Sequence, residues 1–197
     1  MNRSLWIAHG ILAVAAVLAA APAGAAEGRK DEAQRETIRA NAVSLGARPG
    51  PNTGFLIAHI DRYTTDEELA PWIQAFSEGG QRALVAAWQK EEPKVGRVRF
   101  AETLGCDLRV ARSRPTENGR RIVLVTDRPL AAPEVIRGLR TEDYPIAWID
   151  VEVDAEGKGE GTLVAAAQLS VDDQGQLVVE SFGIQPVKLL NVKVELD

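Results

Sequence analysis

The sequence predicts a mainly β (α+β) protein, an antiparallel meander closed as a barrel or folded as a sandwich, with a two-helix insertion after the first hairpin. Three observations favour this fold class. Apolar and polar residues alternate along most of the chain from residue 95 onward, which is the period of a strand. Turn signals, of which Asn118-Gly119 is the strongest, separate these segments. Helical spacing is concentrated in residues 66–91, so strands and helices do not alternate as in a parallel βαβ sheet.

The first residues have the three parts of a secretory signal peptide. Arg3 supplies a positive charge, an apolar stretch follows over residues 5–21, and Ala23 and Ala25 are the small side chains that signal peptidase requires. We therefore expect residues 1–26 to be cleaved from a bacterial protein exported to the periplasm or the medium, with no stable membrane insertion afterwards. An uncleaved anchor is the alternative, although its apolar run is shorter than the ~20 residues that span a bilayer.

The remaining chain has the size of a single domain. Residues 27–35 are charged and lack an apolar pattern, so we expect a disordered lead before one β-rich domain at residues 36–197. The chain has 23 Lys and Arg against 28 Asp and Glu, a net charge of −5, which argues against binding to nucleic acid. Five arginines alternate with apolar residues, and we expect them on a solvated sheet face: Arg109, Arg112, Arg114, Arg120 and Arg121.

The first element of the domain is ambiguous by period. Residues 36–45 fit either helical or strand spacing, and we favour a strand, because the Pro- and Gly-rich residues 46–54 would then form a hairpin with a strong strand at 55–63.

The helical insertion begins at residue 66. Thr65 and Glu68 have the spacing of a capping box. An apolar stripe at helical spacing follows, which we expect to pack on the sheet: Leu69, Trp72, Ile73 and Phe76. Pro71 is expected to kink the first turn, and Gly79-Gly80 to end this helix. A second helix at 81–91 is stopped by Pro93.

Strand periodicity then continues to the end of the chain. Cys106, Leu108 and Val110 share one apolar face, and the apolar run at 122–125 predicts a central strand. Further strands follow around 147–153 and on either side of turns at 155–159 and 172–175. In the last strand the apolar pattern changes phase, which predicts a β-bulge near Leu189–Leu190.

Several stretches of the domain resemble an uncharacterised family of secreted bacterial β-rich proteins with no known activity. They are Arg62-Tyr63-Thr64-Thr65-Asp66, Gly79-Gly80, Gly119-Arg120-Arg121-Ile122-Val123-Leu124, Thr126-Asp127-Arg128-Pro129, Asp143-Tyr144-Pro145 and Gly157-Lys158-Gly159-Glu160-Gly161. The resemblance covers essentially the whole domain after residue 26. It implies export and this strand order, and it supplies no catalytic residue. The family has aromatic residues where this sequence has Cys106 and Val110.

Candidate catalytic and metal-binding residues are few. His59 is the only histidine after residue 26 and lies within a strand, so we expect a cross-strand role and no nucleophilic triad. Cys106 is expected to be an inert buried thiol. The acids at 152–160 resemble part of a calcium loop, but Leu163 stands where the bidentate acid belongs, which favours a hairpin with solvated acids. We therefore expect no catalytic residue, no metal site and no cofactor.

Binding is the function class that remains, and the connection at 127–145, which contains three prolines, is the favoured place for it. The expected contacts are Asp127, Arg128, Tyr144 and Trp148, with Trp148 exposed at the loop. The preferred function is a non-enzymatic exported envelope protein that binds a partner protein or a small apolar ligand. The alternatives are a carboxylate-based hydrolase of glycan or cell-wall material and a purely structural module.

Overall fold

The computed structural model describes residues 35–44, 52–100, 104–130, 143–181 and 185–197. The predicted signal peptide at 1–26 and all but the last residue of the predicted lead lie outside this part of the chain. The elements are β1 (Glu36–Ser44), β2 (Asn52–Ile60), α2 (Asp66–Glu91), β3 (Gly96–Phe100), β4 (Cys106–Thr116), β5 (Gly119–Thr126), β6 (Ile146–Asp154), β7 (Lys158–Val171), β8 (Leu177–Ser181) and β9 (Val187–Leu196). The ambiguous first element is therefore a strand, and it forms the expected hairpin with β2.

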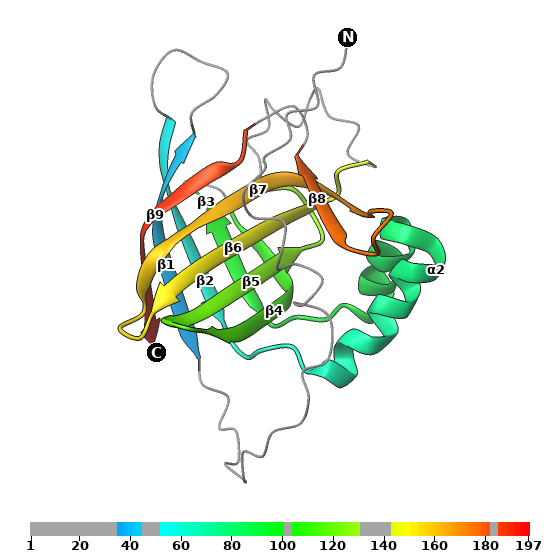
Figure 1. Ribbon diagram of the computed structural model, residues 1–197, viewed down its shortest axis with the longest axis horizontal. Coiled ribbons are helices and arrows are strands. Elements are labelled where there is room, and N and C mark those ends of the chain that lie inside the picture. Colours follow the sequence, from blue (N-terminus) through cyan, green and yellow to red (C-terminus); the bar gives the residue numbers. More distant parts are fainter. Residues whose placement is uncertain (1–34, 45–51, 101–103, 131–142, 182–184) are drawn as a thin grey trace, which may run out of the picture.

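Eight of the strands close into an antiparallel barrel (Figure 1). Strands β1 to β6 pair in chain order, β9 lies between β1 and β7, and the pairing of β6 with β7 completes the ring. Closure leaves no free sheet edge within the ring. β8 pairs only with β7, where β7 extends beyond its pairing with β6. Of the two predicted architectures, the chain adopts the barrel.

Apolar side chains fill the barrel interior. Alternate residues of each strand point inward, and the largest of them are completely buried: Ile38, Leu56, Leu108, Ile122, Leu124, Ile149, Leu163 and Leu189. An eight-stranded barrel has an interior just wide enough for side chains to fill. The interior is therefore a packed core, and Cys106 belongs to it as expected.

Bulges set which residues face inward, and one of them lies in β7, where Ala165 and Ala166 are both opposite Ala147. In β9, both Asn191 and Val192 lie opposite Ala40, and Asn191 has a φ of 51°, so the predicted bulge is present close to its predicted position. In β4, the register with β5 shifts at Arg109. Because of this shift Val110 points outward, and the expectation that it shares a face with Cys106 and Leu108 is wrong.

Buried ion pairs lie towards the two ends of the barrel. At one end, Glu36 accepts hydrogen bonds from Arg120 Nη1 and Nη2 (2.9 and 3.0 Å) and from the Tyr63 hydroxyl (2.7 Å). Burial, followed by the bond to Glu36, raises the pKa of Tyr63 above its usual range. At the other end, buried Arg109 pairs with Asp127. The predicted solvated face is therefore wrong for Arg109, which is buried beside a carboxylate, and for Arg120, which shares an inward face with Ile122. Arg112 and Arg121 are also mostly buried, in ion pairs with Asp66 and Asp150.

The insertion is one long helix that folds back on itself. The capping box of Thr65 and Glu68 is present, and the helix continues through Pro71. Its break is at Gly80, with φ 65° and ψ −162°. Trp72 and Trp88 would be about 24 Å apart in a straight helix, yet their ring centroids are 6.2 Å apart in an edge-to-face arrangement. The two predicted helices are thus the two arms of α2, and the kink expected at Pro71 is at Gly80.

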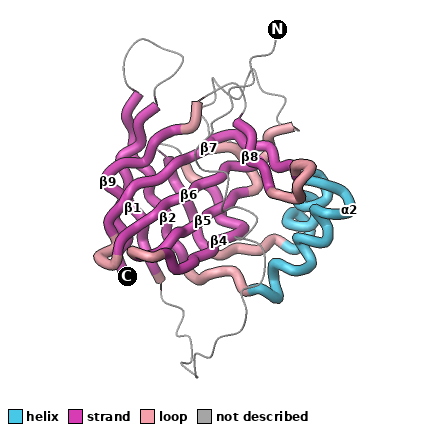
Figure 2. Tube along the Cα trace, in the orientation of Figure 1, coloured by secondary structure: helices cyan, strands magenta, loops and turns pink. Residues whose placement is uncertain are grey.

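Helix α2 covers one side of the barrel from outside (Figure 2). Its buried Leu69 and Trp72 and its partly buried Ile73 and Phe76 form a second apolar cluster with outward side chains of the strands, as the stripe predicted. The strand residues of this cluster are Val110, Val123, Val125, Ile146, Trp148, Val164, Ala167, Leu169 and Leu177. Within the described part of the chain, no helix combines the length and apolar character needed to cross a bilayer.

Candidate functional site

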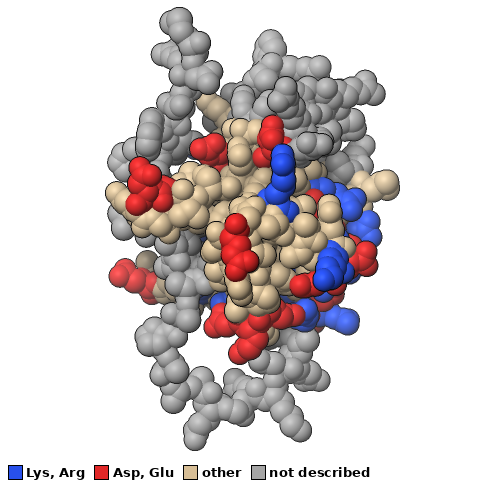
Figure 3. Space-filling view, turned by 90° about the vertical axis from the view of Figure 1, so that its right-hand side faces the viewer, with Lys and Arg blue, Asp and Glu red and all other residues tan. Residues whose placement is uncertain are grey.

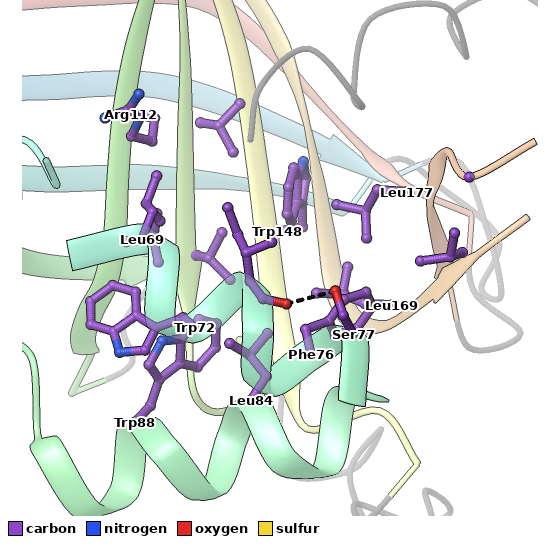
Figure 4. A pocket seen from close by; sticks show the side chains of 16 residues that line it. Leu69, Trp72, Phe76, Ser77, Leu84, Trp88, Arg112, Trp148, Leu169 and Leu177 are labelled. Atoms are coloured by element: carbon purple, nitrogen blue, oxygen red, sulfur yellow. Dashed lines mark hydrogen bonds between the residues drawn. The ribbon is translucent and has the colours of Figure 1, made fainter. Parts of the chain in front are cut away.

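A cavity of about 200 Å³ lies between α2 and the outer surface of the barrel (Figure 4). Both arms of α2 contribute to it, together with β4, β5, β6, β7, β8 and the turn between β7 and β8. Four aromatic side chains line it: Trp72, Phe76, Trp88 and Trp148. The aliphatic lining includes Leu69, Leu84, Val110, Val123, Val125, Leu169 and Leu177. The cavity is therefore a gap within the second apolar cluster and is separate from the packed barrel interior.

The lining offers few polar groups. The Ser77 hydroxyl donates to the Ile73 carbonyl within α2 (2.9 Å) and is therefore already bonded. Arg112 is the one charged residue of the described lining, and Figure 4 shows it at the end away from Trp72 and Trp88. Its guanidinium donates to the Thr64 carbonyl (2.6 Å) and pairs with Asp66. Arg112 thus joins β4 to the start of α2. The lining also includes the indole N–H of Trp88, which is buried without a hydrogen-bond partner among the described residues.

The aromatic wall formed by α2 is fixed in place. Trp72 donates from Nε1 to Glu91 Oε2 (2.7 Å), which ties the first arm to the end of the second. At the bend, Gln81 accepts from the Leu169 backbone N–H and donates from Nε2 to the Asp143 carbonyl (3.2 Å). These bonds hold both arms against the barrel, so the cavity is largely pre-formed.

Trp148 is the predicted site residue that lines this cavity. It faces outward with Asp150 and Glu152, as expected, while Ile149 and Val151 face the barrel interior. The expectation that it is exposed is wrong, since only 6% of it is accessible. The physical reason is that α2 and β8 cover this part of the outer surface.

The other predicted site residues lie elsewhere. Asp127 has only 7% of its side chain exposed and accepts from Arg109 Nη2 at 2.8 Å. Arg128, mostly exposed, has its Nε 3.7 Å from Asp127 Oδ1. Tyr144 is partly buried beside Asp143, whose carbonyl is bonded to Gln81. None of these residues lines the cavity, and residues 131–142 of the predicted connection lie outside the described residues.

Sequence reasoning missed the outward valines of the cavity. The signal was the run at 122–125, which is apolar on both faces of its strand. A strand that is apolar on both faces has to be covered on both faces. The helices of the predicted domain all lie in the insertion at 66–91, so this insertion is the element that can cover the outer face of the strand at 122–125. The apolar stripe of the insertion and the apolar run of the strand together predict a second core outside the barrel.

Reactive groups elsewhere in the described residues have ordinary structural partners. Burial raises the pKa of the Cys106 thiol to about 11. His59 lies opposite Thr37 on β1, whose hydroxyl contacts its Nδ1 (2.9 Å) and donates to Asp197 (2.7 Å). Asp154 Oδ1 accepts backbone N–H groups at its own turn. Among the residues that the structure describes, no group of three or more His, Cys, Asp or Glu is placed to hold a metal ion.

Comparison of the chain with models of protein families, with curated proteins and with solved structures finds no match. The described residues define a closed barrel with a mainly apolar, aromatic-lined cavity beneath an external helix.

Proposed function

We propose that this protein binds a small apolar molecule in the cavity beneath α2. The observation that carries the proposal is the cavity itself, about 200 Å³ in volume and lined mainly by aliphatic and aromatic side chains. An engineered apolar protein cavity of about 150 Å³ binds benzene or xenon. The lining of the cavity beneath α2 includes the exposed Val171 and Gly175, so the cavity is open to solvent on that side. A ligand there removes apolar surface from water and gains dispersion contacts with the lining.

The volume limits the size of the ligand. Sites for drug-sized molecules have volumes of roughly 300–1,000 Å³, larger than this cavity. One or two small rings, or a short branched chain, fit the space, whereas a phospholipid does not. The aromatic lining favours a ring, because Trp72, Phe76 and Trp148 can pack against it edge-to-face or with offset faces.

Nothing in the described lining favours the hydrolase alternative. Glycoside hydrolysis needs two carboxyl groups facing each other across the substrate, and no carboxylate lines this cavity among the described residues. Asp127, the acid that the sequence placed first in a binding site, is paired with Arg109. Ligand binding without chemistry is the function that the geometry supports best.

Titration with toluene, indole and naphthalene tests the proposal. Three of the four tryptophans of the chain line the cavity, so their fluorescence reports on its occupancy by toluene, while calorimetry follows indole and naphthalene, whose own emission overlaps that of tryptophan. We expect saturable binding of at least one compound, confirmed by calorimetry. Val123→Phe fills the cavity and should weaken this binding at least tenfold. Ile57→Phe, on the outward face of β2, is the matched control and should leave binding unchanged.

Two results would refute this function. One is the absence of saturable binding for all three ring compounds in a folded protein. The other is unchanged affinity in Val123→Phe, which would place the ligand elsewhere.

We also infer that the protein acts outside the cytoplasm, on the strength of the apolar stretch at 5–21 and the small residues before Ala26. The protein recovered from the periplasm or the medium of a bacterial host should begin at Ala26 or Glu27. N-terminal sequencing checks this, and recovery of intact Met1 in the membrane fraction would contradict it.

A further inference from the structure

The outward face of β9, β1, β2 and β3, which we call the basic wall, is dominated by exposed cations. These four strands are consecutive neighbours in the barrel and lie outside the second apolar cluster beneath α2. Their exposed basic residues are Arg39, Arg97, Arg99, Lys188 and Lys193. The one acid that points outward from these described strands is Glu195, 3.6 Å from Arg39.

The register places the cations side by side. Lys193 lies opposite Arg39, Arg39 opposite Ile57, and Ile57 opposite Arg99, so three cations share one row across four strands. Neighbouring strands are about 4.8 Å apart. Like charges directly opposite each other on a sheet are destabilising. Glu195 compensates part of the repulsion between Lys193 and Arg39, and an external anion would relieve the rest.

Exposed apolar side chains accompany these cations. Phe55 and Leu190 lie in one row on either side of Asn41, and they are 68% and 37% exposed. Leu104 is 92% exposed, and its carbonyl accepts from Arg97 Nη2 (2.8 Å), which places it beside β3. Three of the five large hydrophobic residues that the described structure exposes thus lie on or next to the basic wall.

The excess of cations is local to this wall. The chain as a whole has a net charge of −5. Helix α2 and its C-cap contain more acids than bases, the acids being Asp66, Glu67, Glu68, Glu78, Glu91 and Glu92. Figure 3, which views the α2 side, shows acidic and basic side chains intermixed. Among the described residues, the basic wall therefore carries a local excess of cations, and an anionic surface would meet the protein there.

We propose that the basic wall docks on an anionic lipid surface. Exposed Lys and Arg are attracted to anionic headgroups, and adjacent exposed apolar side chains enter the boundary between headgroups and acyl chains. A soluble polyanion would use the cations alone and leave Phe55 and Leu104 in water. The combination of both kinds of side chain favours a membrane surface over a polyanion.

Vesicle flotation tests the proposal with the protein as the cell processes it, its N-terminus sequenced beforehand. The vesicles are phosphatidylcholine alone and phosphatidylcholine with 30% phosphatidylglycerol. We expect binding to the anionic vesicles only, weakening as salt is raised. The double variant Arg97→Glu/Arg99→Glu should bind about thirtyfold more weakly or worse, since each cation near the surface contributes, and Phe55→Ser should also bind more weakly.

Arg82→Glu/Lys90→Glu is the matched control, because it changes the same number of charges on exposed residues of α2. Lys188→Glu/Lys193→Glu repeats the test on β9 if the first variant fails to fold. Equal binding to both kinds of vesicle would overturn the proposal, as would an equal loss in the control. Binding to dextran sulfate as tight as to vesicles and unaffected by Phe55→Ser would also overturn it, and so would self-association at low salt without vesicle binding.

Discussion

Two halves of the same barrel have opposite outer surfaces. Beneath α2, outward positions of β4 to β7 carry Val123, Val125 and Trp148, and they are buried. On the basic wall, outward positions at equivalent points of the strand pattern carry Arg39 and Arg97, and they are exposed. An outward direction in a barrel therefore does not mean exposure to water. How much an outward residue contributes to stability depends on whether another helix or strand covers it and removes it from water.

The sharpest form of the comparison concerns two aromatic residues. Trp72 of α2 is only 4% exposed, whereas Phe55 on the basic wall is 68% exposed. We expect Trp72→Ala to lower the free energy of unfolding by ~3–5 kcal/mol, the range for deleting a large buried aromatic residue. Phe55→Ala should change it by less than ~0.5 kcal/mol, as surface substitutions do. Urea denaturation of both variants checks this, and equal effects would mean that the two surfaces do not differ in burial.

The fold of the covered half was predictable where local signals and sheet packing agree. The capping box at Thr65 and Glu68 was confirmed, as was the burial of the stripe that begins at Leu69. The central strand at 122–125 was also confirmed. The choice between a barrel and a sandwich was not predictable, because closure requires β9 to pair with both β1 and β7, and strand alternation is the same in both architectures.

The fold-back of α2 depends on Gly80. Its φ of 65° with ψ of −162° lies in a region essentially restricted to glycine, and an added Cβ would meet nothing within 4 Å. Gly80→Ala should therefore destabilise the protein through backbone strain, since the added Cβ collides with no other atom. We expect it to lower the free energy of unfolding by ~1–3 kcal/mol. Glu78→Ala, on the exposed helix surface, is the control and should be nearly neutral. If Gly80→Ala unfolds at the wild-type urea concentration and keeps its near-ultraviolet circular dichroism, the bend does not need this glycine.

The candidate site was predictable only in part, and bulges and helix geometry explain the rest. Trp148 was selected because it points outward, and it does line the cavity. Asp127 was selected as a binding residue because it begins a long connection. Its partner Arg109 sits where the register of β4 shifts by one residue, which a pattern of strict alternation cannot indicate. The cavity depends on how two helical arms meet a barrel, and no local pattern encodes that fit.

Two arginines extend the comparison to polar contacts. Arg112 is mostly buried and joins β4 to the start of α2 through Thr64 and Asp66, while Arg39 and Glu195 form an ion pair that is more than half exposed. Hydrogen bonds involving charged groups contribute ~1.5–3 kcal/mol, and exposed ion pairs ~0–1 kcal/mol. We expect Arg112→Ala to destabilise the protein by ~1.5–3 kcal/mol and Arg39→Ala by less than ~0.5 kcal/mol. Thermal unfolding compares them, and a cost for Arg39→Ala as large as that for Arg112→Ala would contradict the distinction.

The smallest expected difference between the two surfaces is in how the stability contributed by an ion pair depends on pH. Arg62 donates two hydrogen bonds of 2.8 Å to Glu68, and this contact, assisted by the Thr65 backbone N–H, lowers the pKa of Glu68 below its ordinary value. A lowered pKa in the folded state means that the ionised carboxylate stabilises the fold. That contribution is complete above the pKa of the unfolded chain and is lost as pH falls through the folded value. Both side chains are at least one-third exposed, so solvent screening limits the contribution to ~0.5 kcal/mol.

Glu68→Gln keeps an acceptor for the Thr65 N–H but removes the charge. The wild type should therefore be more stable than Glu68→Gln by ~0.5 kcal/mol at pH 7, and this difference should be lost as pH falls through the lowered pKa of Glu68 in the folded protein. Glu195→Gln on the basic wall is the control, because the pair of Glu195 with Arg39 is 3.6 Å long and more exposed. It should show almost no difference at either pH. If Glu195→Gln showed the larger pH dependence in urea titrations from pH 2 to pH 7, the ion pair at the start of α2 would not be the stronger of the two.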